Sequence, residues 1–306
     1  MRKIWLVAAG LALALAACER TVPESTAAAC LSAEEVEARI VACSTAAEDN
    51  SLASELRSQA LSTRAGAYDE GGDVTAALRD YEAALRLDEE NASALLGRAG
   101  ILLNSGQLDA AEPLLRRAIA IDNSGRANEL MGRTTLRGGR YTDAIGFFNT
   151  ALDADPRSAT ALSGRARAKQ RVGDLAGAAN DYDAAIRADG NLAEARAGRC
   201  WLDLNEQREL ERARNDAEAA AAADPRNVEG QLCRGVLQLR GGEWANARAS
   251  FDAVLAVEPG NPLALFGRGV ARRRSGDNAG REDMNLARDF DGHIGEQFDD
   301  MGVETF

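Results

Sequence analysis

Residues 172–191 read VGDLAGAANDYDAAIRADGN, and nearly the same phrase, GGDVTAALRDYEAALRLDEEN, occupies residues 71–91. Both phrases place a glycine and an aspartate before a helix-forming run. In that run alanines recur seven residues apart (Ala178 and Ala185), with a tyrosine (Tyr182) between them. A single helix does not need small residues at fixed positions. A stack of helices does, because large side chains would wedge apart backbones that approach closely. The stretch therefore predicts stacked helices.

The same pattern extends along most of the chain. Turn glycines recur about every 34 residues, with one repeat skipped, at Gly72, Gly106, Gly139, Gly173, Gly242 and Gly276. Small residues recur as triples spaced twelve and then seven: Ala65, Ala77, Ala84; Ala99, Ala111, Ala118; Gly132, Ala144, Ala151; Ala166, Ala178, Ala185; and Gly235, Ala247, with Val254 in third place. A large apolar residue follows the middle member by four, at Tyr81, Leu115, Phe148, Tyr182 and Phe251.

These residues resemble the tetratricopeptide repeat family. The resemblance covers residues 58–276, about seven repeats, and implies an all-α superhelical solenoid of helix-turn-helix units. One helix pair cannot bury its apolar face alone, so neighbouring pairs stack. We expect residues 31–57 to form an N-terminal capping region with an amphipathic helix over 33–48. Residues 277–306 are expected to cap the other end and to include a short helix near residues 293–301.

One repeat departs from the pattern. In the segment RELERARNDAEAAAAADP, residues 208–225, the spacing gains one residue and both the turn glycine and the aromatic are missing. We expect a longer turn around Asn205 to Glu209.

The N-terminus resembles a bacterial lipoprotein signal. A basic start (MRK) precedes a short apolar run that ends in Leu15-Ala16-Ala17-Cys18. The resemblance implies a signal peptide over residues 1–17, a lipid (palmitate) on Cys18 and a linker over 18–30. Glu19 follows the cysteine instead of an aspartate, which by the same resemblance favours an anchor in the outer membrane, on its periplasmic side. The apolar run is shorter than the roughly 20 residues that cross a bilayer.

Export would place the other cysteines in an oxidising compartment, where disulfides persist. Related exported repeat proteins often carry a cysteine pair before the first repeat, which favours a Cys30–Cys43 disulfide. A helix that began at Ala33 would instead place Cys43 about 15 Å along its axis, so both alternatives stay open. Cys200 stands where a small packing residue belongs. We therefore expect Cys200 and Cys233 to be buried as free thiols, in preference to a disulfide between them.

Arginine and aspartate recur sixteen or seventeen residues apart. These positions face each other in a helix pair, and the spacing predicts structural ion pairs between helices that fix their register. The predicted pairs are Arg64 with Asp80, Arg165 with Asp181, and Arg199 with Asp216. Other repeats have Leu114, Ser250 or Met284 in place of the aspartate, so their arginines need other partners.

The first helices of such solenoids line a concave groove. By resemblance its basic residues are Arg133, Arg137, Arg167, Arg171, Arg240, Arg273 and Arg274, and its apolar residues include Trp201, Leu232, Val236 and Phe266. Arginines 34 residues apart predict rungs on one surface, which would suit an acidic peptide. A solvated arginine-rich surface without a ligand is the alternative.

No catalytic motif is evident. The single histidine, His293, excludes histidine-based triads and multi-histidine metal sites, so we expect no enzyme, no cofactor and no metal. The net charge of −12 argues against nucleic acid as a partner. We therefore expect a lipoprotein scaffold that binds proteins or peptides in cell-envelope assembly or peptidoglycan-enzyme recruitment. The alternatives are a self-associating or pilotin-like assembly factor and, less favoured, an envelope enzyme.

Overall fold

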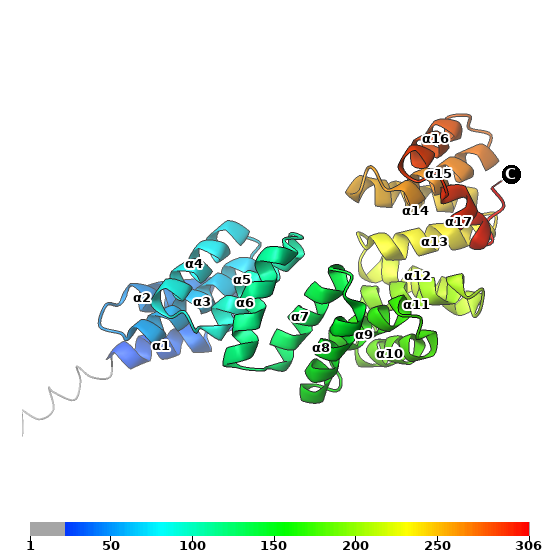
Figure 1. Ribbon diagram of the computed structural model, residues 1–306. Coiled ribbons are helices and arrows are strands. Elements are labelled where there is room, and N and C mark those ends of the chain that lie inside the picture. Colours follow the sequence, from blue (N-terminus) through cyan, green and yellow to red (C-terminus); the bar gives the residue numbers. More distant parts are fainter. Residues whose placement is uncertain (1–21, 306) are drawn as a thin grey trace, which may run out of the picture. The chain divides into compact units, whose positions relative to one another are not determined.

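A computed structural model describes residues 22–305, and every regular element in this range is an α-helix. The prediction of an all-α helical-repeat fold is confirmed. The predicted signal peptide and Cys18 lie outside the described residues. The chain divides into two compact units, residues 1–138 and 139–306 (Figure 1).

The described part of the first unit is a stack of seven helices. Consecutive helices pack against each other, and α3, α5 and α7 also contact one another in succession. The first helices of successive repeats therefore form one layer of this unit. Its helices are α1 (Val22–Ser32), α2 (Val36–Glu48), α3 (Ser54–Glu70), α4 (Val74–Leu87), α5 (Ala92–Asn104), α6 (Leu108–Ile121) and α7 (Gly125–Arg137).

The second unit repeats this arrangement. Its first helices α9, α11, α13 and α15 contact one another in succession, and the last helix, α17, packs on α15 and α16. Its helices are α8 (Tyr141–Ala154), α9 (Ala159–Arg171), α10 (Leu175–Ala188), α11 (Ala193–Asn205), α12 (Leu210–Ala223), α13 (Val228–Arg240), α14 (Trp244–Val257), α15 (Pro262–Arg274), α16 (Gly280–Phe290) and α17 (Ile294–Asp300).

The predicted turns have the expected backbone. Gly173 has φ +87°, which favours glycine because it has no Cβ. The next residue, Asp174, caps α10 by accepting a hydrogen bond from the amide of Gly177 at 2.9 Å. In the turn between α11 and α12, where no glycine is available, Gln207 and Glu209 adopt left-handed conformations instead, with φ of 53° and 49°.

Small residues lie where the helices approach most closely, since all the predicted alanines of the triples are buried. In four repeats the aromatic of the second helix packs against a glycine of the next first helix. A Cβ added to Gly164 would lie 2.3 Å from Cζ of Phe148, and one added to Gly198 would lie 2.5 Å from the ring of Tyr182. The same contact joins Tyr81 with Gly97 and Phe251 with Gly267. We call these contacts ring–glycine wedges.

A disulfide replaces the wedge after the α11–α12 repeat, which has neither an aromatic nor another large apolar residue at that position. Ala217 of α12 stands at the aromatic position, and Cys233 of α13 stands at the glycine position. Cys233 is bonded to Cys200 of α11, with the two Cα atoms 6.5 Å apart. The expectation of buried free thiols is therefore wrong for this pair. Cys200 and Cys233 occupy small-residue positions that face the same gap between adjacent first helices.

The three predicted arginine–aspartate pairs are present. In each, Nε and a terminal guanidinium nitrogen donate to the two carboxylate oxygens at 2.6–2.9 Å, in the pairs Arg64–Asp80, Arg165–Asp181 and Arg199–Asp216. In the last repeat Arg268 binds Asp283 in the same way, at 2.8 and 2.7 Å. The sequence spacing had pointed to Met284, one residue later, which is buried.

Several of these arginines also reach back to the preceding repeat. Arg199 donates to Asp183 at 2.7 Å, and Arg268 donates to Asp252 at 3.1 Å. Arg165 similarly donates to Asn149 at 2.8 Å. Each guanidinium thus joins three helices: its own, the second helix of its repeat and the second helix of the repeat before.

The N-terminal region differs from the expected linker. Residues 22–32 form helix α1, which packs against α2 and α3. Cys30 of α1 is bonded to Cys43 of α2, with a Cα–Cα distance of 4.5 Å. The bridge forms because α2 begins at Val36 and the intervening residues turn the chain back. The distance argument against this disulfide, which assumed a helix from Ala33, is thereby removed.

Residues 294–305, which we call the C-terminal segment, fold back over the first helices of unit 2. Phe298 of α17 is fully buried, and its ring centroid lies 5.0 Å from that of Phe266 on α15. Gly302, with φ +76°, turns the chain after α17. The short helix agrees with the one expected near residues 293–301, but the segment covers more than the end of the stack.

Candidate functional site

All the predicted groove residues lie on first helices. Those of unit 1 are Arg133 and Arg137 on α7, and those of unit 2 are Arg167 and Arg171 on α9, Trp201 on α11, Leu232, Val236 and Arg240 on α13, and Phe266, Arg273 and Arg274 on α15. The unit 2 residues belong to one surface, because their helices α9, α11, α13 and α15 contact one another in succession.

The unit 2 surface holds an ion pair that joins the first helices of two repeats across the repeat between them. Arg167 of α9 pairs with Glu229 of α13, and their side chains are 39% and 43% exposed. Trp201 of α11, which lies between them in the helix order, donates from Nε1 to the backbone oxygen of Glu229 at 3.0 Å. Burial opposes the charge on Arg167, but Glu229, Tyr182 and Glu194 together outweigh the effect of burial and raise the pKa of the guanidinium.

The predicted arginines are not a row of unpaired cations. Arg137 donates to the backbone oxygen of Leu103, and the guanidinium carbon of Arg171 lies 4.9 Å from the ring centroid of Tyr141. Arg137 and Arg171 keep their charges in these contacts, whereas the charge of Arg167 is balanced by Glu229. The basic groove stays a prediction.

The apolar part of the predicted groove is buried within the chain itself, and the C-terminal segment contacts Phe266 directly. Leu232, Val236 and Phe266 are all buried, and they belong to one cluster with Ile294, Phe298, Met301 and Val303 of the C-terminal segment. These three residues are correctly placed on first helices, but they are not an open lining. Sequence periodicity identified the helix face and could not reveal that a later segment would occupy it.

Backbone hydrogen bonds hold the C-terminal segment in this position. Arg240 donates from Nη1 to the carbonyl of Met301 at 2.9 Å and to Oε1 of Gln207 at 2.7 Å. Arg274 donates to the carbonyl of Glu304 at 2.9 Å. Two predicted groove arginines thus bind a peptide backbone, but that backbone belongs to the same chain.

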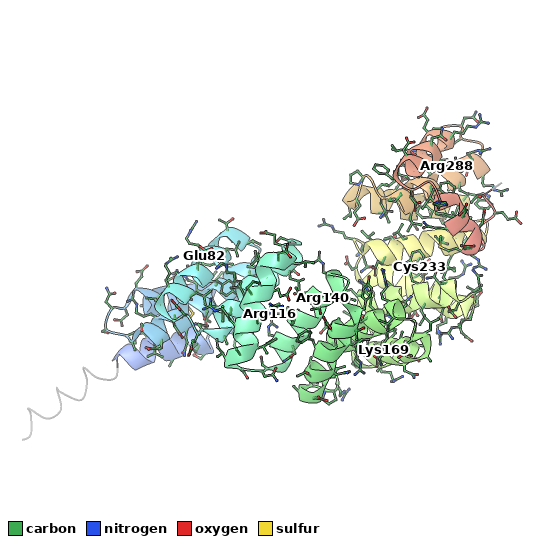
Figure 2. All side chains as sticks on the ribbon, viewed as in Figure 1. Glu82, Arg116, Arg140, Lys169, Cys233 and Arg288 are labelled. Carbon is green, nitrogen blue, oxygen red and sulfur yellow. A yellow bond between two sulfur atoms is a disulfide. The ribbon has the colours of Figure 1, made fainter. Side chains whose placement is uncertain are left out.

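The remaining open part of the unit 2 layer is the surface formed by Arg167, Arg171, Trp201 and Glu229, which we call the Trp201 surface. It lies beside a rigid support, since Tyr182, packed in its wedge, donates from its hydroxyl to Gln170 of α9 at 3.2 Å. Burial raises the pKa of Tyr182 to about 12. Lys169, labelled in Figure 2, lies on the same helix and pairs with Asp181 at 2.8 Å.

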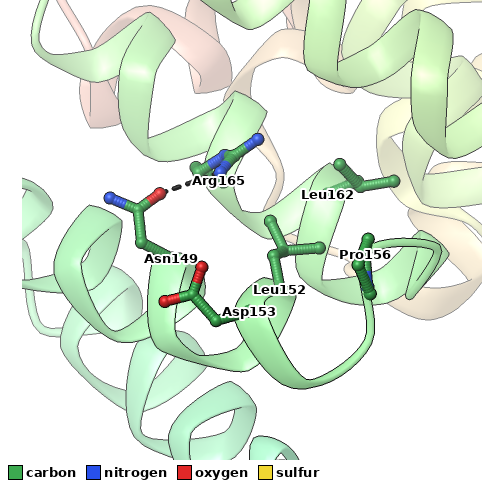
Figure 3. Close-up of a pocket in the computed structure, with 6 residues that line it drawn as sticks. All are labelled: Asn149, Leu152, Asp153, Pro156, Leu162 and Arg165. Carbon is green, nitrogen blue, oxygen red and sulfur yellow. Dashed lines mark hydrogen bonds between the residues drawn. The ribbon is translucent and has the colours of Figure 1, made fainter.

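Unit 2 also has a cleft of about 650 Å³, which is lined by residues of α8, α9 and the turn between them and by none of the four residues of the Trp201 surface (Figure 3). Asn149 and Arg165 form its polar wall and are hydrogen-bonded to each other. Arg165 also binds Asp181. The cleft walls consist of side chains already engaged in holding helices together, so we assign it no binding role.

Within residues 22–305 no group of three or more histidine, cysteine or acidic residues could hold a metal ion. His293 is exposed, and its Nδ1 lies 3.1 Å from Glu296. No helix in this range is long and apolar enough to cross a membrane.

Sequence reasoning missed two features of the site. Glu229 was not predicted, although it lies 35 residues after Glu194 and so follows the repeat period. Asp203, with a fully buried side chain, binds Arg212 at 2.8 and 2.7 Å across the turn that lacks glycine. The signal for this pair was an acid in an otherwise apolar stretch, WLDLN.

The fold is a helical-repeat solenoid of the tetratricopeptide type. The tetratricopeptide repeat profile matches residues 63–126, 202–256 and 234–280. Among curated proteins, the human mitochondrial import receptor subunit TOM70 is 26% identical over 190 residues. That match covers 58% of this chain and 31% of TOM70, so the chain spans about a third of its relative.

Solved structures show the same fold. A tetratricopeptide repeat protein from Parabacteroides merdae superposes with a TM-score of 0.54 at 18% identity, covering 80% of this chain and 98% of that protein. PilW, a type IV pilus biogenesis factor, superposes with a TM-score of 0.56 at 21% identity, covering 68% of this chain and 96% of PilW. The repeat fold is suited to protein–protein interaction.

Proposed function

We propose that the chain is a lipid-anchored scaffold on the periplasmic side of an outer membrane, and that it binds a segment of a partner protein through the Trp201 surface. The observation that carries this proposal is the composition of that surface. A partly exposed indole lies beside an ion pair whose two side chains are each about two-fifths exposed. An indole can receive an apolar side chain, while charges of both signs bind the amides and carbonyls of a peptide.

Two further observations support the compartment and the role. The four cysteines among residues 22–305 form two disulfides, which fits an oxidising compartment. The relatives with this fold include an import receptor subunit and a pilus biogenesis factor. We propose a comparable role for this chain, in envelope assembly or in the recruitment of peptidoglycan enzymes.

The binding test uses charge reversal at matched positions. Arg167→Glu places two acids together on the Trp201 surface, whereas Arg187→Glu makes the same change on an exposed position of α10. Partner recovery from envelope extracts, quantified by mass spectrometry, should fall at least tenfold for Arg167→Glu and stay unchanged for Arg187→Glu. Equal recovery by both variants would move binding away from this surface.

A double variant separates direct contact from structural support. Arg167→Glu with Glu229→Arg restores the ion pair with its charges exchanged. If recovery stays low, the partner contacts these charges directly; if recovery returns, the pair acts only by holding α9 to α13.

The anchor is tested separately by Cys18→Ser. We expect loss of labelled palmitate incorporation and release of the protein from the membrane fraction. Retention of both would contradict a lipid on this residue.

A further inference from the structure

We infer that the covered surface of α13 and α15 is a second peptide-binding groove, and that the C-terminal segment is its resident ligand. This inference rests on the proposed function and deepens it. The segment would compete with a partner peptide of the same chemistry: apolar residues at relative positions 1, 5, 8 and 10, on a short helix that ends in a turn.

The first argument is the way the segment is bound. Ile294, Phe298, Met301 and Val303 are buried, and they alternate with the exposed residues Glu296, Gln297, Asp299 and Asp300. Only one face of the segment meets the first helices. This is the manner in which an amphipathic peptide lies in a groove, with aromatic and aliphatic anchors inserted and the polar side in solvent.

The second argument is that the groove recognises backbone as well as side chains. Gln207, Arg240 and Arg274 each donate to a carbonyl oxygen of the segment, at 3.0, 2.9 and 2.9 Å, on Asp300, Met301 and Glu304 respectively. Backbone carbonyls are common to every peptide, so these three donors would bind another chain equally well. Selectivity then lies with the apolar anchors, above all with Phe298, whose ring contacts Phe266.

The third argument is the course of the chain. The segment does more than add one further helix to the end of the stack. Its carbonyls reach residues at the C-terminal ends of α13 and α15 and in the turn after α11, so it crosses three successive repeats. A linker of Asp291, Gly292 and His293 joins it to α16, and residues 292 and 293 are exposed. A segment attached through an exposed linker can leave its site without unfolding the helices beneath it.

A tethered ligand hides its own site from free peptide. Such a segment acts at an effective concentration on the order of 1 mM. For a peptide that binds the emptied groove with a Kd of about 10 µM, the tether raises the apparent Kd about 100-fold. The intact chain should therefore bind a copy of its own segment weakly, and the same chain should bind it well once the tether is cut.

The experiment cuts the tether in the folded, full-length protein. A protease site is inserted after Gly292, and the purified chain is tested before and after cleavage with a fluorescent synthetic peptide of residues 291–305. A second peptide carries Phe298→Ser. Circular dichroism and hydrogen exchange of α13–α16 report whether the fold survives cleavage.

We expect the cleaved chain to stay folded, to bind the wild-type peptide about 100-fold more tightly than the uncleaved chain, and to ignore the Phe298→Ser peptide. Three results would overturn the inference: a folded cleaved chain that does not bind, equal binding before and after cleavage, or loss of protection in α13–α16. The last would show that the segment is an integral part of the core.

Variants of the intact chain give an independent test. Phe298→Ser removes a buried anchor, whereas Phe290→Ser makes the same change at a side chain that is 62% exposed on α16. Peptide affinity of the uncleaved protein should rise only for Phe298→Ser, and unchanged affinity would contradict the inference. Partner recovery through the Trp201 surface does not depend on this result, so failure of this inference leaves the proposed function standing.

Discussion

Gly164 and Gly146 allow the packing of one aromatic ring to be measured with a matched pair of variants. Both glycines lie inside helices next to Phe148, Gly146 on the same helix and Gly164 on the following one. A Cβ at Gly164 would lie 2.3, 2.6 and 3.0 Å from three ring atoms of Phe148. A Cβ at Gly146 would meet nothing within 4 Å.

The two alanine variants share the gain in helix propensity, which is about 1 kcal/mol. They differ only in the packing cost. Phe148 is fully buried, so its ring has no free space to enter, and overpacking of this kind costs about 1–3 kcal/mol. Gly146→Ala should therefore raise the free energy of unfolding by about 1 kcal/mol, and Gly164→Ala should lie about 1–3 kcal/mol below it.

Urea unfolding, followed by circular dichroism, measures the difference, and hydrogen exchange of α8 and α9 locates it. Repeat proteins can lose cooperativity between distant repeats, so the local measurement is needed. Adding Phe148→Leu to Gly164→Ala should recover part of the loss, because the two residues are in contact. Equal stability of Gly164→Ala and Gly146→Ala would refute the wedge.

Three other perturbations have defined outcomes. Replacing Cys200 and Cys233 by alanine should lower the free energy of unfolding by about 3–4 kcal/mol, measured by urea unfolding without reductant; a loss below about 1 kcal/mol would mean that the bridge does not substitute for a wedge. Because burial raises the pKa of Tyr182 to about 12, the folded state keeps this proton while the unfolded state loses it near pH 10. Stability should therefore fall between these values as the pH rises. An absorbance titration of tyrosinate should lose a component near pH 12 in Tyr182→Phe, and an unchanged titration would contradict the burial. Asp203→Asn removes the charge that faces Arg212 and should cost about 1–2 kcal/mol, since the arginine is partly solvated. Exchange rates of the amides in the α11–α12 turn should rise with it, and unaltered rates would argue that the pair is not holding the turn.

The sequence was sufficient for the repeat fold because its signals are local and recur. Three signals restrict a helix pair: a turn glycine such as Gly173, a capping acid such as Asp174 and the spacing of small residues. Because the same three signals recur in several repeats, together they identify the repeat fold. The Arg64–Asp80 spacing likewise fixed a contact, since both residues lie in one hairpin. The Arg268–Asp283 pair was displaced by one residue from the expected position because α16 packs one residue earlier in register, with Gly280 and not Arg281 against Gly269.

Contacts that depend on more than one repeat were not predictable in the same way. The Cys200–Cys233 bridge depends on the distance between neighbouring first helices, which periodicity does not give. The burial of Phe266 depends on where a segment 28–39 residues later comes to rest. Its helix face could be assigned from the repeat, but its exposure could not.

The arginines that join three helices have a consequence for how such a chain can change in length. Each guanidinium binds one group sixteen residues before it and another fifteen to seventeen residues after it. A gain or loss of one whole repeat within the run that carries these arginines returns every donor to an equivalent acceptor. An insertion or deletion of any other length would leave a buried charge without its partner. The exception is a change within a turn, such as the extra residue after α11. Selection on charge pairing alone would therefore favour duplication and deletion in whole repeats.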